Sequence, residues 1–314
     1  MFLVMGHNYS YTDLDSIISS VIFAEIWTAL GHPSKAVLIN PKGIKESTIN
    51  ILEHIGNIEI PKIVLKTELE NSDLILVDHN NPEESYGKLG INQTPYMIID
   101  HHLDIGLSPV HKMIERVGST CTLITEISKA EGIRLTERQA RALAFGILSD
   151  TRGLKGRKTS ERDIKMIHYL YKEYIIYESV ETIAEMTLKP TNIQMMSIND
   201  ILRNSLKEYQ NGSIGIAAIE VADDSYKERL EEILNKGHQM GYGLYILMII
   251  KYHVQETEIF YFDRDFLLFP KRERRNGLVS RGQDFAPEIL ERIHDSNSAH
   301  GRTKRDSPYT EQSP

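Results

Sequence analysis

Two short stretches of the chain end an apolar run with an aspartate that is followed at once by a histidine. They are VDHN at residues 77–80 and IDHH at residues 99–102. Further acidic and imidazole side chains stand beside other apolar runs in the first half of the chain, at His7, Asp13, Asp15 and Asp150. Carboxylates and imidazoles are ligands for borderline and hard divalent ions, so this set of residues indicates metal chemistry.

These side chains meet only if the elements that carry them share one edge of one sheet. The runs FLVMG, KAVLIN, KIVL, DLILVD and YMIID are short and apolar, and helical patterns separate them. This alternation predicts βαβ units and an α/β fold with a parallel, doubly wound N-terminal sheet. Ligands of such sheets bind beyond the carboxyl ends of the strands, which is where the acid and imidazole residues stand.

Several carboxylates in one small space raise each other's pKa and destabilise the fold unless a cation compensates them. The mixed Asp and His set, without a thiolate, suits Mn²⁺ or Mg²⁺ better than a soft ion, although Zn²⁺ or Co²⁺ also fits. Two ions bridged by one carboxylate, about 3.5–4 Å apart, can hold an activated hydroxide and clamp a phosphoryl oxygen. Alone, DLD predicts a helix cap and VDHN an Asx turn. Their joint occurrence at strand ends predicts a two-metal phosphoryl hydrolase.

The second half of the chain predicts a smaller α/β domain with a mixed sheet. Its strand-like runs are IGIAAIEVAD, LYILMIIKYHV and EIFYFD, and a charged helix lies between the first two. A proline and several polar residues interrupt the pattern at residues 187–194. We place the linker there, between a metal-binding domain (1–186) and a substrate-binding domain (195–294). Residues 295–314 are polar and predict a disordered tail.

Composition limits the class of protein. The 314 residues, 41% apolar and 25% charged, suit a globular protein of two domains. The net charge of -8 gives no general attraction to a nucleic-acid duplex, so an anionic substrate needs local cations or bound metal. The single cysteine, Cys121, excludes an intrachain disulfide and fits a reducing compartment. With no signal peptide and no membrane-length apolar run, the sequence predicts a cytoplasmic protein without a membrane partner.

Taken together, the motifs resemble those of the DHH phosphoesterases, and among them the family II inorganic pyrophosphatases. The similar stretches are GH with DLDSI, LVDHN, IIDHH, VGSTCTLITEI, GILSDT followed by Lys155, LKEY and SRGQDFAP. The resemblance implies an N-terminal parallel-sheet domain that carries the metals and a C-terminal domain that closes over pyrophosphate. It also implies a homodimer formed through an edge strand of the N-terminal sheet, with VLIN and KIVL as candidate edges.

The resemblance further implies which residues hold metal. One ion is expected at His7, Asp13 and Asp78. The second is expected at Asp15, Asp78, His101 and Asp150, with Asp78 as the bridge. The cofactors implied are two Mn²⁺ ions, or Co²⁺, with Mg²⁺ accompanying the substrate.

The same resemblance implies a catalytic and substrate-binding set. Asp78, Asp100 and His102 form the expected catalytic group, in which His102 hydrogen-bonds the phosphate or the leaving oxygen and Asp100 orients the neighbouring imidazole. His79 is expected to contact substrate or to stand behind a ligand rather than to bind metal. Lys155, Lys207 and Arg281 complete the expected phosphate-binding set.

Two positions depart from the family pattern. Its first motif, G-H-x-N-P-D-x-D, places the histidine four residues before the first aspartate, whereas His7 stands six before Asp13, and Tyr9 occupies the ungapped position. DLDS without that histidine is more similar to exopolyphosphatase and prune-type relatives. The family ends in S-R-K-K-Q, but here Gly282 follows Arg281. The basic cluster KRERR at 271–275 is a candidate replacement, although alone it predicts an exposed basic turn, and Lys207 alone predicts a solvated helix residue.

The leading hypothesis is therefore metal-dependent hydrolysis of inorganic pyrophosphate to two phosphates by a metal-bridging hydroxide. The first alternative is a related phosphohydrolase that acts on short-chain polyphosphate or, as a phosphodiesterase, on short or cyclic nucleotides, because Gly282 leaves room for a different leaving group. A non-catalytic family member is the third hypothesis, suggested by the altered spacing at His7 and the missing lysine.

Overall fold

The computed structural model describes residues 1–8, 12–40, 44, 46–56, 58–187, 193–210 and 212–302. The chain divides into two compact units, Met1–Lys189 and Pro190–Pro314, here called unit 1 and unit 2. Residues 188–192 of the predicted linker and residues 303–314 of the predicted tail lie outside the described residues. None of the helices in the described part of the chain has both the length and the apolar character that a bilayer crossing requires.

Unit 1 is built on a six-stranded sheet in the order β3-β2-β1-β4-β5-β6, and every neighbouring pair is parallel. The strands are β1 (Phe2–Met5), β2 (Ser34–Leu38), β3 (Lys62–Ile63), β4 (Asp73–Val77), β5 (Met97–Asp100) and β6 (His111–Ile114). Apart from the terminal residues Asp73 and Asp100, the central strands β1, β4 and β5 are apolar because both faces of the sheet are covered. The predicted parallel, doubly wound sheet is confirmed. Its edges are β6 and β3, which contains part of KIVL, whereas VLIN begins within the inner strand β2 and continues past its end.

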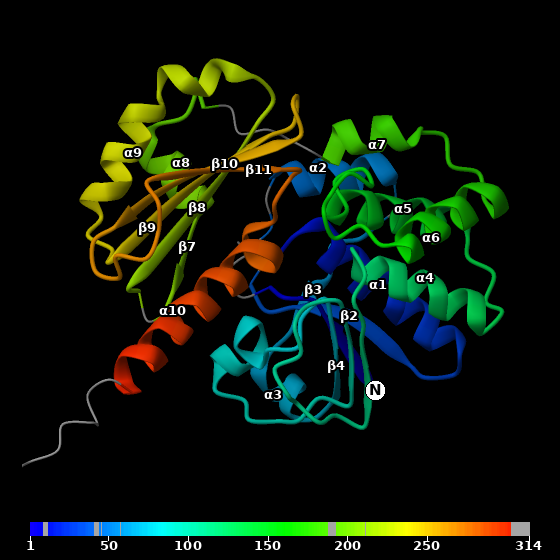
Figure 1. Cartoon of the computed structure of the whole chain (residues 1–314). Helices are drawn as coiled ribbons and strands as arrows, with labels where there is room; N and C mark the ends of the chain where they lie inside the picture. Colours follow the sequence, from blue (N-terminus) through cyan, green and yellow to red (C-terminus); the bar gives the residue numbers. More distant parts are fainter. Residues whose placement is uncertain are drawn as a thin grey trace, which may run out of the picture. The chain divides into compact units, whose positions relative to one another are not determined.

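Helices cover the two faces of this sheet unequally. Figure 1 shows α1, α4, α5, α6 and α7 together on one side and α3 on the other. Val4, Ile75 and Ile99 point into the larger core beneath the helix group, while Leu3, Leu74 and Ile98 point into the smaller core on the opposite face. The helices of unit 1 are α1 (Leu14–Ala29), α2 (Glu46–Ile55), α3 (Lys66–Glu70), α4 (Thr120–Ala130), α5 (Glu137–Asp150), α6 (Glu161–Glu173) and α7 (Val180–Thr187), with 3₁₀ turns at Pro82–Glu84 and Tyr86–Leu89.

The strand order reverses between β1 and β4, because β2 and β3 lie on one side of β1 and the later strands lie on the other. In a parallel sheet such a reversal leaves a crevice beyond the carboxyl ends of the two strands. Asp78 follows the end of β4 directly, and His7 stands two residues after the end of β1. The fold therefore presents the first two candidate ligands at the position where doubly wound sheets bind their ligands.

Unit 2 contains a five-stranded sheet in the order β11-β10-β9-β8-β7, in which only the β8–β9 pair is parallel. The predicted mixed sheet is confirmed. Buried residues of α8 and α9 pack on one face, and Phe285, Ile289 and Ile293 from α10 and the turn before it pack on the other. The elements are α8 (Ile198–Ser205), β7 (Leu206–Tyr209), β8 (Ile214–Val221), α9 (Leu230–Gln239), β9 (Leu244–Lys251), β10 (Glu256–Asp263), β11 (Arg272–Asn276) and α10 (Ala286–Arg302), with a 3₁₀ turn at Asp224–Glu228 and a π-helical turn at Arg281–Phe285.

Three local predictions in unit 2 were wrong. The basic cluster at 271–275 forms most of the edge strand β11 instead of a turn, because Arg272–Asn276 pairs with β10. Lys207 lies in the edge strand β7 and not in a helix. The helix α10 continues to Arg302, so residues 295–302 of the expected tail are helical. Ile289 and Ile293 anchor this helix in the core, and no proline interrupts its cooperative extension into the polar residues that follow.

Candidate metal centre

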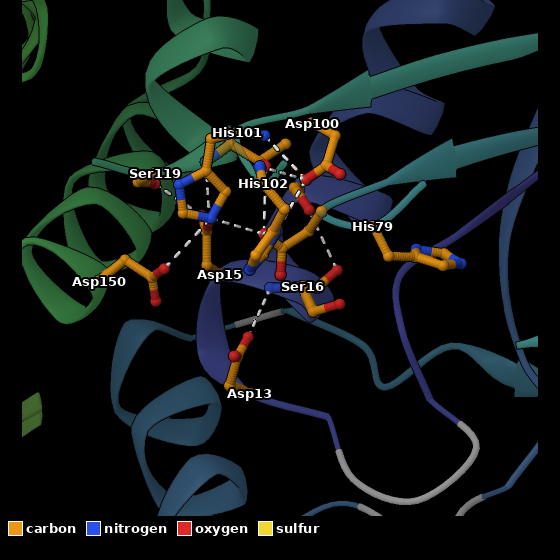
Figure 2. Close-up of polar contacts among 12 residues, drawn as sticks. Asp13, Asp15, Ser16, His79, Asp100, His101, His102, Ser119 and Asp150 are labelled. Carbon is orange, nitrogen blue, oxygen red and sulfur yellow. Dashed lines mark hydrogen bonds and ion pairs between the residues drawn. The ribbon is translucent and has the colours of Figure 1, made fainter. Parts of the chain in front are cut away.

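The predicted ligands come from the ends of five elements of unit 1. His7 follows β1, Asp78 follows β4 and His101 follows β5, while Asp13 and Asp15 stand at the start of α1 and Asp150 ends α5. Figure 2 shows Asp15, His101 and Asp150 directed towards a common space. All six predicted ligands fall into groups whose ligand atoms lie within 4.8 Å of one another: His7 with Asp13 and Asp78; Asp15 with His101 and Asp150; and Asp78 with Asp100, His101 and His102.

The first group resolves the altered spacing at the N-terminus. His7 Nε2 lies 3.3 Å from Asp13 Oδ2 and 3.3 Å from Asp78 Oδ2, so the histidine reaches the cluster despite the two additional residues. Asp13 is also the N-cap of α1, since its Oδ1 accepts a hydrogen bond from Ser16 N at 3.0 Å. Its second oxygen remains directed at His7. Tyr9, the other candidate for this position, lies outside the described residues.

Asp78 also belongs to the neighbouring group. Its Oδ1 lies 3.2 Å from His101 Nε2, and the same nitrogen lies 3.5 Å from Asp150 Oδ2. His101 Nδ1 is 3.2 Å from the carbonyl oxygen of Val117, a contact that favours Nδ1–H and leaves Nε2 as the ligand atom. Asp78 thus has one oxygen directed at each group, as a bridging ligand requires.

Protons and a metal ion would compete for the carboxylate and imidazole side chains of this cluster. Burial and the neighbouring Asp78 raise the pKa of Asp15 to about 7. Burial and Asp15 raise the pKa of Asp150 well above its usual value. Burial lowers the pKa of His101, but the hydrogen bond and the charge of Asp78 outweigh burial and raise this pKa to about 10. A bound dication would displace these protons, because metal ligands must be deprotonated.

Asp78 carries the clearest sign that the donor set fits a metal. Burial alone would raise its pKa, yet His101 and His7 hold the pKa well below its usual value, so the side chain is an anion. Asp78 Oδ2 is buried and accepts no hydrogen bond from the described residues. Its neighbour His7 Nε2, at 3.3 Å, would donate no hydrogen bond as a metal ligand, so a cation would be needed to compensate this buried carboxylate oxygen. The residues present therefore fit a divalent ion.

Asp100 lies behind the cluster and holds His102. Its Oδ1 accepts hydrogen bonds from the backbone nitrogens of His101 at 2.8 Å and His102 at 3.1 Å, and lies 2.8 Å from His102 Nδ1. Asn80 donates to the other carboxylate oxygen at 2.5 Å. Burial opposes ionisation, but the bond from His102 lowers the pKa of Asp100. Asp100 thus contacts His102 through the Nδ1 side of a half-exposed imidazole, which is consistent with the predicted orienting role.

His79 is not brought into the cluster. Its Nδ1 lies 2.9 Å from the Val77 carbonyl oxygen and its Nε2 lies 2.8 Å from Ser85 Oγ, so protein groups occupy both ring nitrogens. Figure 2 shows the ring directed away from the other labelled side chains. Burial lowers the pKa of His79, which favours the neutral ring. This geometry does not support the expected substrate contact and leaves His79 with a packing and hydrogen-bonding role.

The sequence prediction missed a group of donors at the start of α4. Ser119 Oγ and the backbone nitrogens of Thr120 and Cys121 donate to the two oxygens of Asp15 over 2.7–3.0 Å. Thr120 Oγ1 donates to Asp78 Oδ1 at 3.1 Å. The available signal was the serine and threonine pair before an apolar helical run, which predicts a helix N-cap. Cys121 is free and buried.

The predicted phosphate-binding residues occupy two different places. Lys155 is exposed in the turn that follows α5. In unit 2, Arg281 donates from Nη1 to the carbonyl oxygen of Ser205, two residues before Lys207 on the edge strand β7. The basic strand β11 forms the opposite edge of this sheet, so it does not replace a lysine beside Arg281. A Cβ atom at Gly282 would meet no atom within 4 Å, so the backbone there has room for a side chain.

A parallel sheet with Asp and His side chains clustered at its switch point defines a metal-binding domain of the phosphoesterase type, and comparison with known families agrees. Residues 1–147 match the family model described as "DHH family, N-terminal domain". This match covers 147 of the 314 residues, and it confirms the resemblance to the DHH family that the motifs indicated.

Relatives that span both units carry one description. A "Probable manganese-dependent inorganic pyrophosphatase" of Lactobacillus helveticus is 25% identical over 92% of this chain and 97% of that protein. A protein of the same description from Brevibacillus brevis is 28% identical over 70% of this chain and 71% of its own. The crystal structure of a "putative family II inorganic pyrophosphatase" from Methanococcus jannaschii has a TM-score of 0.74 at 24% identity, covering 94% of this chain and 100% of that one. This last likeness supports the fold.

Proposed function

We propose that the protein is a manganese-dependent inorganic pyrophosphatase that hydrolyses pyrophosphate to two phosphates. The observation that carries the proposal is Asp78, whose two oxygens face two adjacent groups of acid and imidazole side chains. Relatives described as manganese-dependent inorganic pyrophosphatases align with most of the chain and support the choice of metal and substrate.

The two groups divide the ligands as follows. His7, Asp13 and Asp78 would hold one ion, and Asp15, Asp78, His101 and Asp150 the other. Mn²⁺ fits this mixed set, Co²⁺ is an alternative, and Mg²⁺ would accompany the substrate. When bound, such a pair of ions supplies an activated water and withdraws charge from the phosphoryl oxygens.

His102 supplies the proton chemistry in this proposal. Asp100 fixes the ring through Nδ1, so Nε2 is the atom presented to substrate. In its imidazolium form, Nε2–H donates to the leaving phosphate oxygen and transfers the proton as the bond to phosphorus breaks. The ionised Asp100 stabilises the imidazolium and holds its plane.

Cationic side chains are needed to bind the substrate because pyrophosphate and its phosphate products each carry several negative charges. Lys207 and Arg281 are proposed to bind the phosphate that leaves, and Lys155 to contribute a further positive charge. The contact between Arg281 and Ser205, two residues before Lys207, supports treating Arg281 and Lys207 as one phosphate-binding group. Removing either charge should raise KM for pyrophosphate more than it lowers kcat, because binding is lost in the ground state as well.

The direct test measures phosphate release by protein purified with EDTA and then loaded with Mn²⁺, Co²⁺ or Mg²⁺. We expect hydrolysis of pyrophosphate with Mn²⁺ or Co²⁺, and little activity without metal. An inactive, fully folded Mn²⁺-loaded protein would refute the proposal. A folded protein that binds no Mn²⁺ when the ion is added would favour a non-catalytic family member.

The second candidate function is hydrolysis of short-chain polyphosphate or of short nucleotides, favoured by the open backbone at Gly282. A panel of pyrophosphate, tripolyphosphate and a dinucleotide separates the candidates by kcat/KM. Gly282→Lys restores the family lysine at a position with room for it and should shift the preference towards pyrophosphate. Gly241→Lys, at another open glycine of unit 2, controls for the added charge, although its φ of 83° adds local strain.

We also propose that two copies associate through an edge of the unit 1 sheet. The edge strand β6 is solvent-exposed or half-exposed along its length, and Val110 and Met113 expose 70% and 38% of their surface. Open edges pair readily with a second strand. His111 N and Glu115 N donate into β5, so the N–H of Lys112, which alternates with them, faces the open edge. Light scattering should give a dimer for the protein and a monomer for Lys112→Pro, because this proline removes a donor from the open edge alone.

A further inference from the structure

One loop contacts three of the six candidate metal ligands, although it contributes no ligand itself. This segment, Val117–Cys121, is here called the 117–121 loop. The Val117 carbonyl oxygen lies 3.2 Å from His101 Nδ1, the end of the loop donates three hydrogen bonds to Asp15, and Thr120 Oγ1 donates to Asp78. The orientation of Asp15, Asp78 and His101 therefore depends on where this loop stands.

The hydrogen bond from Thr120 also fixes the orientation of the Asp78 carboxylate. Thr120 Oγ1 is the hydroxyl donor to Asp78 Oδ1, at 3.1 Å, and Oδ2 receives no hydrogen bond from the described residues. The threonine thus fixes the rotation of the carboxylate and leaves its other oxygen directed at His7. Partners behind a metal ligand set its orientation and affinity in this way.

A second carboxylate, Asp163 of α6, anchors the loop from the side away from the ligands. Gly118 N donates to both of its oxygens, at 3.1 and 2.9 Å, and Thr122 Oγ1 donates to Oδ1 at 2.6 Å. The side chain of Asp163 is fully buried, and its remaining hydrogen bonds go to Ser160. No candidate ligand is among its hydrogen-bond partners, so any effect it has on metal must pass through the loop.

The 117–121 loop is also tightly packed at Gly118. A Cβ atom at Gly118 would lie 2.5 Å from Thr151 Cγ2 and 2.9 Å from Asp163 Oδ2. Thr151 is the residue after Asp150, so the loop packs against the end of α5 as well as against α6. The anchor therefore links the elements that carry the second group of candidate ligands.

We propose that Thr120 and Asp163 are positioning residues of the metal centre, in which Asp163 anchors the 117–121 loop and Thr120 orients the bridging carboxylate of Asp78. This inference rests on the metal centre of the proposed function. An ordinary role for Asp163 would be to cap α6, where Ser160 and Asp163 form a reciprocal capping box. The two roles differ in what the loss of Asp163 does to metal affinity.

The test measures Mn²⁺ affinity by calorimetry in the absence of pyrophosphate, together with the melting temperature of each metal-free variant. Thr120→Val removes the hydroxyl at nearly constant shape and should weaken Mn²⁺ binding about 10- to 100-fold, whereas Thr120→Ser keeps the donor and should bind nearly as the wild type does. Asp163→Asn cannot accept all of the bonds made by both oxygens and should weaken binding about 10-fold. Ser160→Ala is the matched control, because it removes the cap of α6 but leaves the bonds of Asp163 to Gly118 and Thr122.

Unchanged Mn²⁺ affinity in Thr120→Val would overturn the role of Thr120, and equal affinities in Asp163→Asn and Ser160→Ala would reduce Asp163 to a helix cap. If Asp163→Asn does not fold, the Thr120 pair still decides whether the loop orients the metal centre. Mn²⁺ binding that weakens in the variants while the wild type leaves pyrophosphate intact would support this inference and reject the proposed function. The reverse result, active wild type and unaffected variants, would do the opposite.

Discussion

The carboxyl ends of β4 and β5 carry the same pair of side chains and use them in opposite ways. After β4, Asp78 enters the metal centre, and His79 turns away to bond Val77 and Ser85. After β5, Asp100 stays behind the cluster, and His101 lies against Asp78 and Asp150. One strand end supplies the acid and the other supplies the imidazole.

The backbone at the first strand end accounts for part of this difference. Asp78 has a φ of 60°, in the left-handed region, whereas Asp100 remains within β5. A left-handed residue at the end of a strand changes the direction of its side chain relative to the strand pleat. Aspartate is one of the few residues that tolerate this conformation. A shared motif therefore fixes which residue types are present, and the local backbone determines which of them faces the candidate metal centre.

The largest effect is expected where the two strand ends meet, at Asp78. Asp78→Ala removes the shared ligand and should lower pyrophosphate hydrolysis on the order of 1,000-fold or more, because charge stabilisation by both ions is affected. Mn²⁺ binding should be lost with it. Asp73→Ala, at the exposed start of the same strand, is the control and should retain activity. Comparable losses in both variants would point to a folding defect of β4 rather than a bridging role.

A smaller effect is expected from the acid of the second strand end. Asp100→Asn keeps the shape but removes the charge that holds His102, and it should lower kcat about 10- to 100-fold while Mn²⁺ affinity changes much less. If Asp100 acts through His102, the double variant with His102→Gln should be no worse than His102→Gln alone. Additive losses in kcat would instead give Asp100 an independent role, and the two strand ends would then be more alike than their contacts indicate.

The sheets illustrate which parts of this molecule were predictable from the sequence. Apolar runs predicted β1 to β5 and β8 to β10, because buried strands need continuous apolar side chains. Three strands were missed, namely β6, β7 and β11, and all three form sheet edges. Edge strands carry charge and little apolar surface, as HKMI, LKEY and RERRN do here, so they lack the periodic signal of an inner strand.

The candidate site was likewise predictable only in part. Strand ends predicted that acid and imidazole side chains gather at one edge of the sheet, because parallel strands finish at one edge, and the structure brings them together there. The assignment of individual ligands came from the family resemblance and stays a prediction. The direction of His79, the hydrogen bonds of the 117–121 loop and the anchor at Asp163 did not follow, because each depends on contacts between elements far apart in the chain. Asp163 stands more than 40 positions from Gly118, and nothing local in its sequence distinguishes it from any other helix cap.

The raised pKa values of Asp15 and His101 predict that the stabilisation of the fold by Mn²⁺ depends on pH. In the metal-free protein the pKa of Asp15 is raised to about 7 and that of His101 to about 10, so the folded state binds these protons more tightly than the unfolded chain. Their contribution to stability is present at low pH and decreases as pH rises through 7 and towards 10. Protons compete with the ion, so the increase in melting temperature caused by Mn²⁺ should grow between pH 6 and pH 8. Thermal unfolding of metal-free and Mn²⁺-loaded protein at each pH measures this rise in melting temperature. A rise that stays constant or becomes smaller between pH 6 and pH 8 would contradict the clustered arrangement of Asp15 and His101.

The smallest effect on activity is expected at His79, the imidazole that faces away from the centre. His79→Gln should leave kcat and Mn²⁺ affinity near their wild-type values, because neither ring nitrogen is available to an ion or to substrate. It should nevertheless lower the free energy of unfolding by about 1–3 kcal/mol, since Val77 and Ser85 keep buried polar atoms without their partner. Ser85→Ala removes one of the two contacts and should cost less stability. A fall in kcat as large as that of His102→Gln would show that the ring turns inward during the reaction, and the two strand ends would then use their histidines alike.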